Sequence, residues 1–148
     1  MRPQGTPIGL KLATTSKTVG AAFNAALAAE GGSVPVWLIL SSLKHTLWST
    51  QLDLARSLGI EGPTLTRHLD NLERNGLVSR QRSETDRRAF RVELTEAGEA
   101  AHDRMLGAVI AFNRHLQAGL SRDDLQRLDE LLTQLARNVG PAEFAEPG

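Results

Sequence analysis

Residues 54–80, LARSLGIEGPTLTRHLDNLERNGLVSR, contain two short helical patterns separated by only a few residues. In the first pattern, leucine and alanine recur at helical spacing as far as Gly59, and glycine commonly ends a helix. The second pattern begins near Gly62 and stops before Gly76. Two short helices joined this tightly predict a helix-turn-helix.

The second of these helices divides into an apolar and a polar face. Three leucines at spacings of four and three form one stripe, and Arg67 and Arg74 point almost directly away from it. Short residues beside a long, fork-ended donor suit entry into a DNA major groove, although an ordinary solvated helix face has the same pattern. The candidate DNA-contacting residues on this helix are Pro63, Thr64, Thr66, Arg67, His68 and Asn71.

A hairpin is predicted next, with strands at residues 77–81 and 91–95 and a polar loop, called the wing here, at residues 82–90. From Arg67 to Arg91 there are seven arginines and four acidic residues, a net charge of +3 inside a chain of net charge zero. Arginine-rich loops suit phosphate contact and a narrow minor groove. A solvated, salt-bridged hairpin is the alternative interpretation.

Helical patterns flank this segment on both sides. An alanine-rich helix is expected over residues 8–29, and Ser33 is the expected N-cap of a buried helix that carries Val36, Leu38, Ile39, Leu40 and Leu43. Ser49 or Thr50 is the expected N-cap of the first helix of the pair, and Thr50 with Asp53 resembles a capping box. Thr95 is expected to cap a long helix that reaches about Leu120. Ser121 and Asp124 form a capping box for a last helix with a leucine stripe.

These elements predict a mainly α-helical fold with a small β-hairpin. Residues 33–99 would form a winged helix-turn-helix DNA-binding domain, and residues 1–32 and 100–148 a helical dimerisation region. The leucine-rich last helix carries more apolar surface than a small core can cover, which favours a homodimer over packing within one chain alone.

Composition narrows the class of protein. There is no cysteine, which excludes disulfides, thiolate metal sites and thiol redox sensing. No signal peptide and no apolar stretch of about 18 residues is evident, so we expect a soluble, cytoplasmic protein with no membrane association.

Residues 54–98 resemble the core of the MarR family, and within it the SlyA branch. Three pieces carry the resemblance in the same order and spacing: LGIEGPTLTRHLDNLERNGLVSR, the Asp86-Arg87-Arg88 motif, and LTEAG at residues 94–98. The flanking helices also agree with that family. The resemblance therefore covers most of the chain.

The resemblance implies a transcriptional regulator, more often a repressor, that binds palindromic double-stranded DNA as a homodimer with its first and last helices intertwined. The helix over residues 62–75 would read the major groove, and the wing would enter the minor groove through Arg87, with Arg82 as a further contact. Arg88 would fix the wing by pairing with an acid such as Glu61 or Asp70, and Asp86 of the same motif would also be structural.

MarR-type proteins often bind small aromatic or phenolic acids between the dimer helices and the DNA-binding lobe. By position, the candidate effector-binding residues are Lys17, Trp37 and Ser41. Lys17 could hold a carboxylate, and Trp37 could stack on a ring. The alternative to ligand binding is core packing for Trp37 and a solvated surface charge for Lys17. Thr14 and Ser41 stand where the SlyA pattern has Arg and His.

Other classes of function are less well supported by the sequence. There is no Gly-rich phosphate loop, nucleophile elbow or metal-ligand cluster, so neither an enzyme nor a cofactor or zinc site is expected. Glu99, His102 and Asp103 are interpreted as a solvated helix face. The remaining alternative is a winged-helix module that binds protein and not DNA.

Overall fold

The computed structural model describes residues 5–46, 50–82 and 90–140, with the backbone alone at Arg82 and Phe90. The chain divides into two units, residues 1–112 and residues 113–148, which are described separately. None of the helices in the described ranges combines the length and the apolar character that a bilayer crossing requires.

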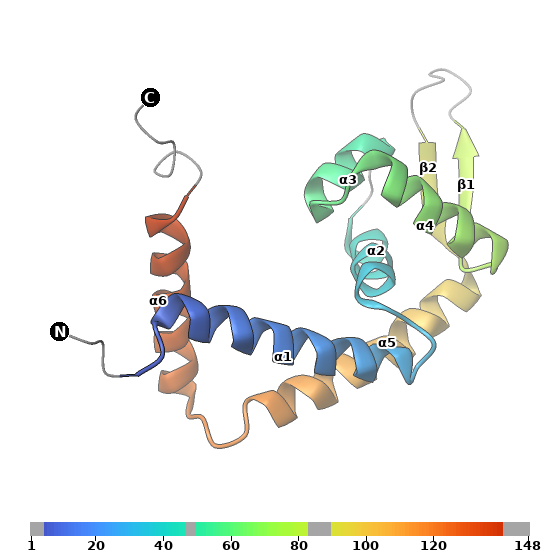
Figure 1. Ribbon diagram of the computed structural model, residues 1–148. Helices are drawn as coiled ribbons and strands as arrows, with labels where there is room; N and C mark the ends of the chain where they lie inside the picture. The colour runs from blue at the N-terminus through green and yellow to red at the C-terminus, as the bar shows by residue number, and fades with distance from the viewer. Residues whose placement is uncertain (1–4, 47–49, 83–89, 141–148) are drawn as a thin grey trace, which may run out of the picture. The chain divides into compact units, whose positions relative to one another are not determined.

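Four helices open the first unit: α1 (Ile8–Ala28), α2 (Val34–His45), α3 (Gln51–Leu58) and α4 (Gly62–Arg74) (Figure 1). Side-chain caps fix two of their starts, as the sequence predicts. The Ser33 hydroxyl accepts a hydrogen bond from the Val36 amide at 3.3 Å, and Thr50 accepts one from the Asp53 amide at 3.0 Å.

The α3–α4 connection is a tight turn. Gly59 ends α3 in the left-handed conformation at φ 65°, which a residue without a Cβ adopts at no steric cost. The Ile60 amide returns to the Ala55 carbonyl at 3.0 Å. The Gln51 side-chain amide also donates to the Thr66 hydroxyl at 3.2 Å, so the two helices are hydrogen-bonded to each other. The predicted helix-turn-helix is confirmed.

An antiparallel hairpin follows, made of β1 (Val78–Arg82) and β2 (Phe90–Leu94), with Val78 opposite Leu94 and Arg80 opposite Val92. Its strands begin one residue away from the predicted bounds. The Leu77 amide bonds to the Leu72 carbonyl at 2.9 Å, so Leu77 still closes α4 and does not start β1. Together with the helices, the hairpin gives the mainly α-helical winged-helix fold that the sequence predicts.

The core of the first unit joins these elements. Leu65, Leu69 and Leu72 of α4 are buried, which confirms the predicted leucine stripe. They belong to one cluster with residues of the other elements, including Leu27, Ile39, Leu40, Leu54, Val78, Ala101 and Met105. The expectation that the apolar residues of α2 are buried is wrong at Leu38, which is 39% exposed.

The junction of α4, β1 and α5 (Glu96–Leu116) is close-packed. The Thr95 hydroxyl accepts a hydrogen bond from the Gly98 amide at 3.0 Å and so caps α5, as predicted. The Thr95 amide donates to the Leu77 carbonyl at 3.1 Å. A Cβ on Gly98 would overlap that same carbonyl oxygen, so only glycine fits here. The two ends of the hairpin are thereby fixed to each other.

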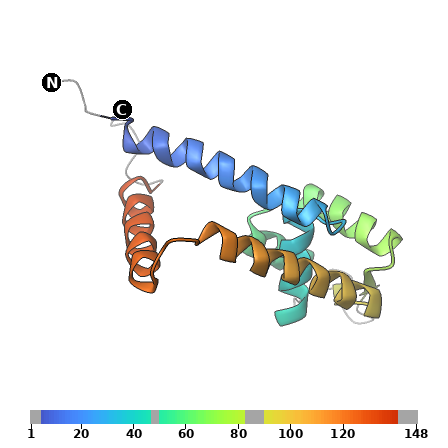
Figure 2. The same ribbon diagram turned by 90° about the horizontal axis from the view of Figure 1, so that it is seen from below.

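Helix α5 lies against α1 and α2 within the first unit. The rings of Phe23 and Phe112 are 5.1 Å apart between centroids, and α1 and α5 can be followed in Figure 2. The interpretation of His102 as part of a solvated face is wrong, because His102 is 2% exposed and stacks on Trp37. Glu99 and Asp103 are exposed, but both pair with Lys44.

The second unit contains the end of α5 and α6 (Arg122–Asn138). Helix α5 ends at Leu116 and not at the predicted Leu120, because the chain turns there and Gly119 takes a φ of 83°. The predicted capping box is confirmed: Asp124 donates its amide to the Ser121 hydroxyl at 3.0 Å and accepts the Ser121 amide at 2.9 Å. The leucine stripe of α6 is largely exposed.

Candidate nucleic-acid interface

The exposed face of α4 is built by the burial of its opposite face. Because the three leucines are fixed in the core, Pro63, Arg67 and Asn71 are exposed to solvent. Thr64 and His68 flank them and are half-buried, so their side chains are less available than the sequence suggests. Near the helix start, this face carries short side chains and one long cation, Arg67.

Arg67 and Arg74 are the two arginines of this helix, and they differ in their partners. In the described part of the chain, Arg67 makes no hydrogen bond or ion pair with another side chain. Arg74, further along the same helix, donates to the Asn71 side-chain oxygen at 3.3 Å and keeps its charge. Both guanidinium groups can therefore donate to an external acceptor such as a phosphate or a guanine edge.

Thr66 is exposed, but its hydroxyl is already used inside the helix pair. It donates to the Gly62 carbonyl at 3.1 Å and accepts from Gln51 at 3.2 Å. A hydroxyl has a single hydrogen to donate, so none is left for an external acceptor. Thr66 therefore holds α4 to α3 in this structure, a role that helical spacing alone could not reveal.

Arg80 is tied to the acidic residues of α4. It shares a face of β1 with the buried Val78, so its side chain is directed toward α4. One guanidinium nitrogen, Nη2, lies 2.5 Å from an Asp70 carboxylate oxygen and 3.1 Å from a Glu73 oxygen. The Nε nitrogen donates to the other Glu73 oxygen at 3.3 Å. Asp70, expected as a partner of Arg88, thus has Arg80 as a partner.

The electrostatics of this group follow from its hydrogen bonds. The bonds that Arg80 donates hold the pKa of Glu73 below its ordinary value of 4.5. The Glu73 carboxylate in turn raises the pKa of the Arg80 guanidinium. Both groups are therefore charged at neutral pH. The positive charge of Arg80 is balanced by two carboxylates. It therefore does not add to the basic surface, although the count of arginines in the sequence had suggested that it would.

The described part of the hairpin contains a second balanced arginine. Arg91 Nε lies 2.6 Å from a Glu93 carboxylate oxygen on the same strand. Glu61, at the start of α4, is exposed. The remaining predicted wing residues lie outside the described residues: Asp86, Arg87 and Arg88 entirely, and Arg82 as a side chain.

The three residues expected at an effector site differ in exposure. Lys17 on α1 is exposed and has no partner among the described residues. Ser41 is half-buried. Trp37 is half-buried as well, and its indole stacks on the His102 ring with centroids 5.1 Å apart and planes 18° apart. The structure thus gives Trp37 an aromatic partner inside the protein.

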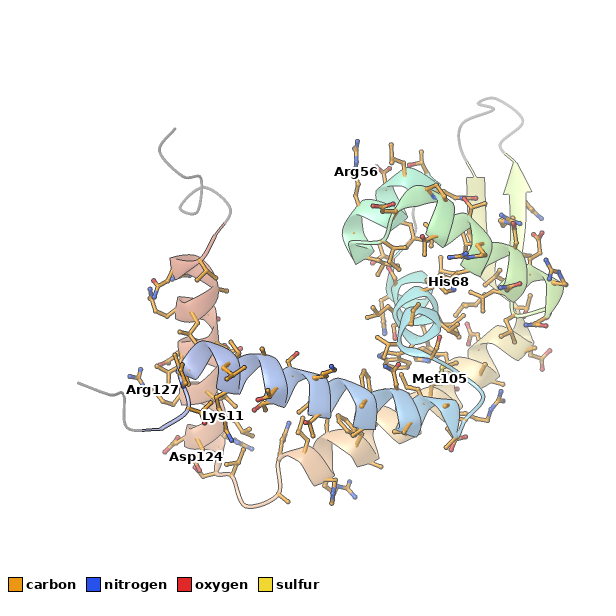
Figure 3. All side chains as sticks on the ribbon, viewed as in Figure 1. Lys11, Arg56, His68, Met105, Asp124 and Arg127 are labelled. Atoms are coloured by element: carbon orange, nitrogen blue, oxygen red, sulfur yellow. The ribbon has the colours of Figure 1, made fainter. Side chains whose placement is uncertain are left out.

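A cavity of about 150 Å³ lies elsewhere in the first unit, between α4, α5 and the α1–α2 turn. Figure 3 labels His68 and Met105, which contribute to its wall from α4 and α5. None of the three expected effector residues lines it. The polar residues of its wall are Glu30, His68, Asn71, Asn75 and Arg104, and Val36, Leu72, Leu77, Ala101 and Met105 supply apolar surface.

A polar cluster joins α2 to α5. Lys44 lies 3.3 Å from an Asp103 oxygen and 3.7 Å from a Glu99 oxygen. His102 Nδ1 lies 3.2 Å from the same Asp103 oxygen. The hydrogen bonds with His102 first, and with Lys44 second, lower the pKa of Asp103 below its ordinary value of 3.8. Within the described ranges, no three His, Asp or Glu residues are placed to hold a metal ion.

Comparison with known proteins agrees with this geometry. The sequence model of the MarR family matches residues 33–90, which include the helix-turn-helix. The chain is 30% identical to the transcriptional repressor CouR, solved bound to a 23-mer DNA duplex. The match covers 88% of this chain and 93% of CouR with a TM-score of 0.80.

Two further solved structures are similar. The transcriptional regulator PA3341 is 32% identical, with 89% of this chain and 97% of that chain covered and a TM-score of 0.72. A mutant MarR from E. coli, complexed with operator DNA, is 24% identical over 87% of this chain and 93% of its own. It has the same fold, with a TM-score of 0.76. From the matched family segment and the near-complete coverage of relatives at 30% identity or more, the chain belongs to the MarR family.

Proposed function

We propose that the chain is a transcriptional regulator that binds double-stranded DNA, with α4 in the major groove and Arg67 as its principal contact. The observation that carries this proposal is the exposed Arg67, which has no partner among the described residues and lies directly opposite three buried leucines. Because the buried leucines fix α4 on the core, its exposed face is held at a defined distance from the core. Arginine there can donate two hydrogen bonds to guanine or bind a phosphate.

The wing supplies the second contact in this proposal. Arg87, with Arg82, enters the adjacent minor groove, where the narrow groove attracts arginine. Arg88 holds the wing through an acid such as Glu61. The sequence motif at residues 86–88 also supports placement in the SlyA-like branch of the family.

A homodimer would bring two copies of α4 to one duplex. Its support is the exposed apolar surface at both ends of the chain, with Ile8 at 68% exposure on α1 and Leu128 and Leu131 at 45% each on α6. Two copies of α4, the helix that would read the DNA, spaced by about one turn of the DNA helix would contact the two halves of a palindromic operator. Because the similar protein CouR is a repressor, repression is the proposed outcome of binding.

A small aromatic or phenolic effector would release the DNA. Lys17, Trp37 and Ser41 form one candidate seat, and the cavity beside α4 is the other. The cavity combines an apolar wall with a few polar side chains, as small-molecule sites do. An occupant there would contact His68 and Asn71 on the reading helix.

The DNA-binding proposal is tested by selecting bound sequences from random duplexes and then comparing variants on the best one. Arg67→Ala and Arg87→Ala should each weaken binding by about tenfold or more, as the loss of a base-edge or groove contact does. Arg127→Ala on α6, which removes an arginine paired with Glu130, is the matched control and should change affinity little. Unchanged affinity in both test variants would overturn the assignment.

The salt dependence separates the DNA-binding proposal from a module that binds protein. Affinity for the selected duplex should fall steeply as salt rises, because phosphate contacts release counterions. An affinity that does not change with salt, or no binding at all, favours the protein-binding alternative.

Sedimentation at micromolar concentration tests the dimer, and a stable monomer would contradict it. Calorimetry with salicylate, on the protein alone and on its DNA complex, tests the effector; no heat and no release of DNA would remove it.

A further inference from the structure

Arg80 occupies an unusual place for an arginine of a DNA-binding hairpin. Its side chain is only 17% exposed, and two of its three nitrogens are engaged with carboxylates. The Glu73 carboxylate receives it at both oxygens, which is the two-point geometry that fixes the orientation of both partners. An arginine held in this way is poorly placed to reach a phosphate.

The two acids belong to the reading helix itself. Asp70 and Glu73 are three residues apart on α4, and their side chains are 46% and 43% exposed. On the helical wheel, Asp70 lies only about 60° from Arg67. Glu73 lies further round the helix, about 120° from Arg67. Both carboxylates are partly exposed on the helix that would approach the duplex, so DNA phosphates would repel them, Asp70 most strongly, and such repulsion between like charges weakens association.

We infer that Arg80 is a positioning residue for DNA binding, which acts by neutralising Asp70 and Glu73 and holding them against the hairpin, and not by contacting DNA. The inference rests on the proposed function. It explains why the acids of α4 coexist with a DNA-facing Arg67. It also predicts that the role of Arg80 exists only while Asp70 and Glu73 are charged.

A thermodynamic cycle tests this on the full-length protein with the selected duplex. Arg80→Gln should weaken binding about tenfold in the otherwise native chain, a coupling within the range measured for residues in one network. In a background that carries Asp70→Asn and Glu73→Gln, the same change should cost less than about threefold. The background variant itself should bind at least as tightly as the native chain.

Salt gives a second readout that a purely structural role would not move. The loss caused by Arg80→Gln should shrink as ionic strength rises, because the uncovered repulsion between carboxylates and phosphates is screened. Arg91→Gln is the matched control. It removes the same charge from the hairpin at an arginine paired with Glu93, and its effect should be equal in both backgrounds.

Three results would overturn the inference. An equal loss from Arg80→Gln in both backgrounds means that Arg80 contacts DNA itself. A loss from Asp70→Asn and Glu73→Gln as large as that from Arg80→Gln means that the group is scaffold alone. Failure of the native chain to bind any duplex removes the proposed function and this inference with it. If Arg80→Gln unfolds, Arg80→Met, which also removes the charge but keeps a long side chain, is compared in the two backgrounds by the same criterion.

Discussion

The indole of Trp37 stacks on the imidazole of His102, with ring centroids 5.1 Å apart and ring planes 18° apart. His45 approaches the same imidazole edge-on at 6.2 Å. Since Trp37 and His45 lie on α2 and His102 on α5, the aromatic contacts join the helix before the helix-turn-helix to the helix after the hairpin. His102 is therefore a structural residue of the core.

Replacement of His102 by alanine should destabilise the protein by about 2–4 kcal/mol, because a cavity forms and the ring stack is lost. Urea unfolding followed by circular dichroism measures this. His115→Ala, at an exposed position of α5, is the control and should change stability by less than about 0.5 kcal/mol. Equal effects of the two variants would show that the stack contributes nothing.

Asp103 makes stability depend on pH in a defined direction. Its pKa is lowered in the folded state, first by the hydrogen bond with His102 and then by Lys44, from an ordinary value of 3.8. A lowered carboxylate pKa stabilises the fold above the unfolded value, and this contribution is lost as the pH falls through the folded value. The native protein should therefore have a higher melting temperature than Asp103→Asn at neutral pH, and the two melting temperatures should converge as the pH falls below 3.8 and through the lowered folded value. A difference that persists in acid would contradict this.

Gly98→Ala should be strongly destabilising, by about 3 kcal/mol or more, since its Cβ would overlap the rigid Leu77 carbonyl. Gly107 is a control on the same helix, with no atom within 4 Å of the position that a Cβ would take. Gly107→Ala should stabilise by about 0.5–1 kcal/mol because alanine favours the helix. Thermal unfolding of the two variants should shift in opposite directions; shifts of the same sign would refute the steric argument.

Thr66→Val should barely change DNA affinity, by less than about threefold, whereas Arg67→Ala next to it should cost about tenfold or more. The reason is that the Thr66 hydroxyl donates within α4 and accepts from Gln51, while Arg67 has no such partner among the described residues. Binding of both variants to the selected duplex measures this. A loss from Thr66→Val as large as that from Arg67→Ala would show that the hydroxyl turns toward DNA in the complex.

Local sequence signals predicted much of the fold. Ser33, Thr50, Thr95 and Ser121 cap helices where predicted, because capping depends on residues three positions apart. The leucine stripe of α4 is buried for the same reason: helical periodicity is a local property. These features needed no knowledge of which elements meet.

What the sequence could not predict depends on contacts between distant residues. The burial of His102 requires α2 to lie against α5, and the pairing of Arg80 with Asp70 and Glu73 requires β1 to lie against α4. Charged and polar residues at such positions look like a solvated surface in the sequence. A clue was present in the alternation of β1, which places Arg80 on the same face as Val78.

The leucines exposed along α6 bear on what a defective copy of this protein would do to an intact one. In the proposed homodimer, a chain with Arg67→Ala keeps those leucines, so in a cell that makes both chains it would still pair with normal subunits. Each mixed pair would then hold only one working reading helix, so the inactive allele would be dominant over the normal one. If the proposed dimer depends on α6, a chain that lacked α6 as well would not pair with normal subunits, and its allele would be recessive.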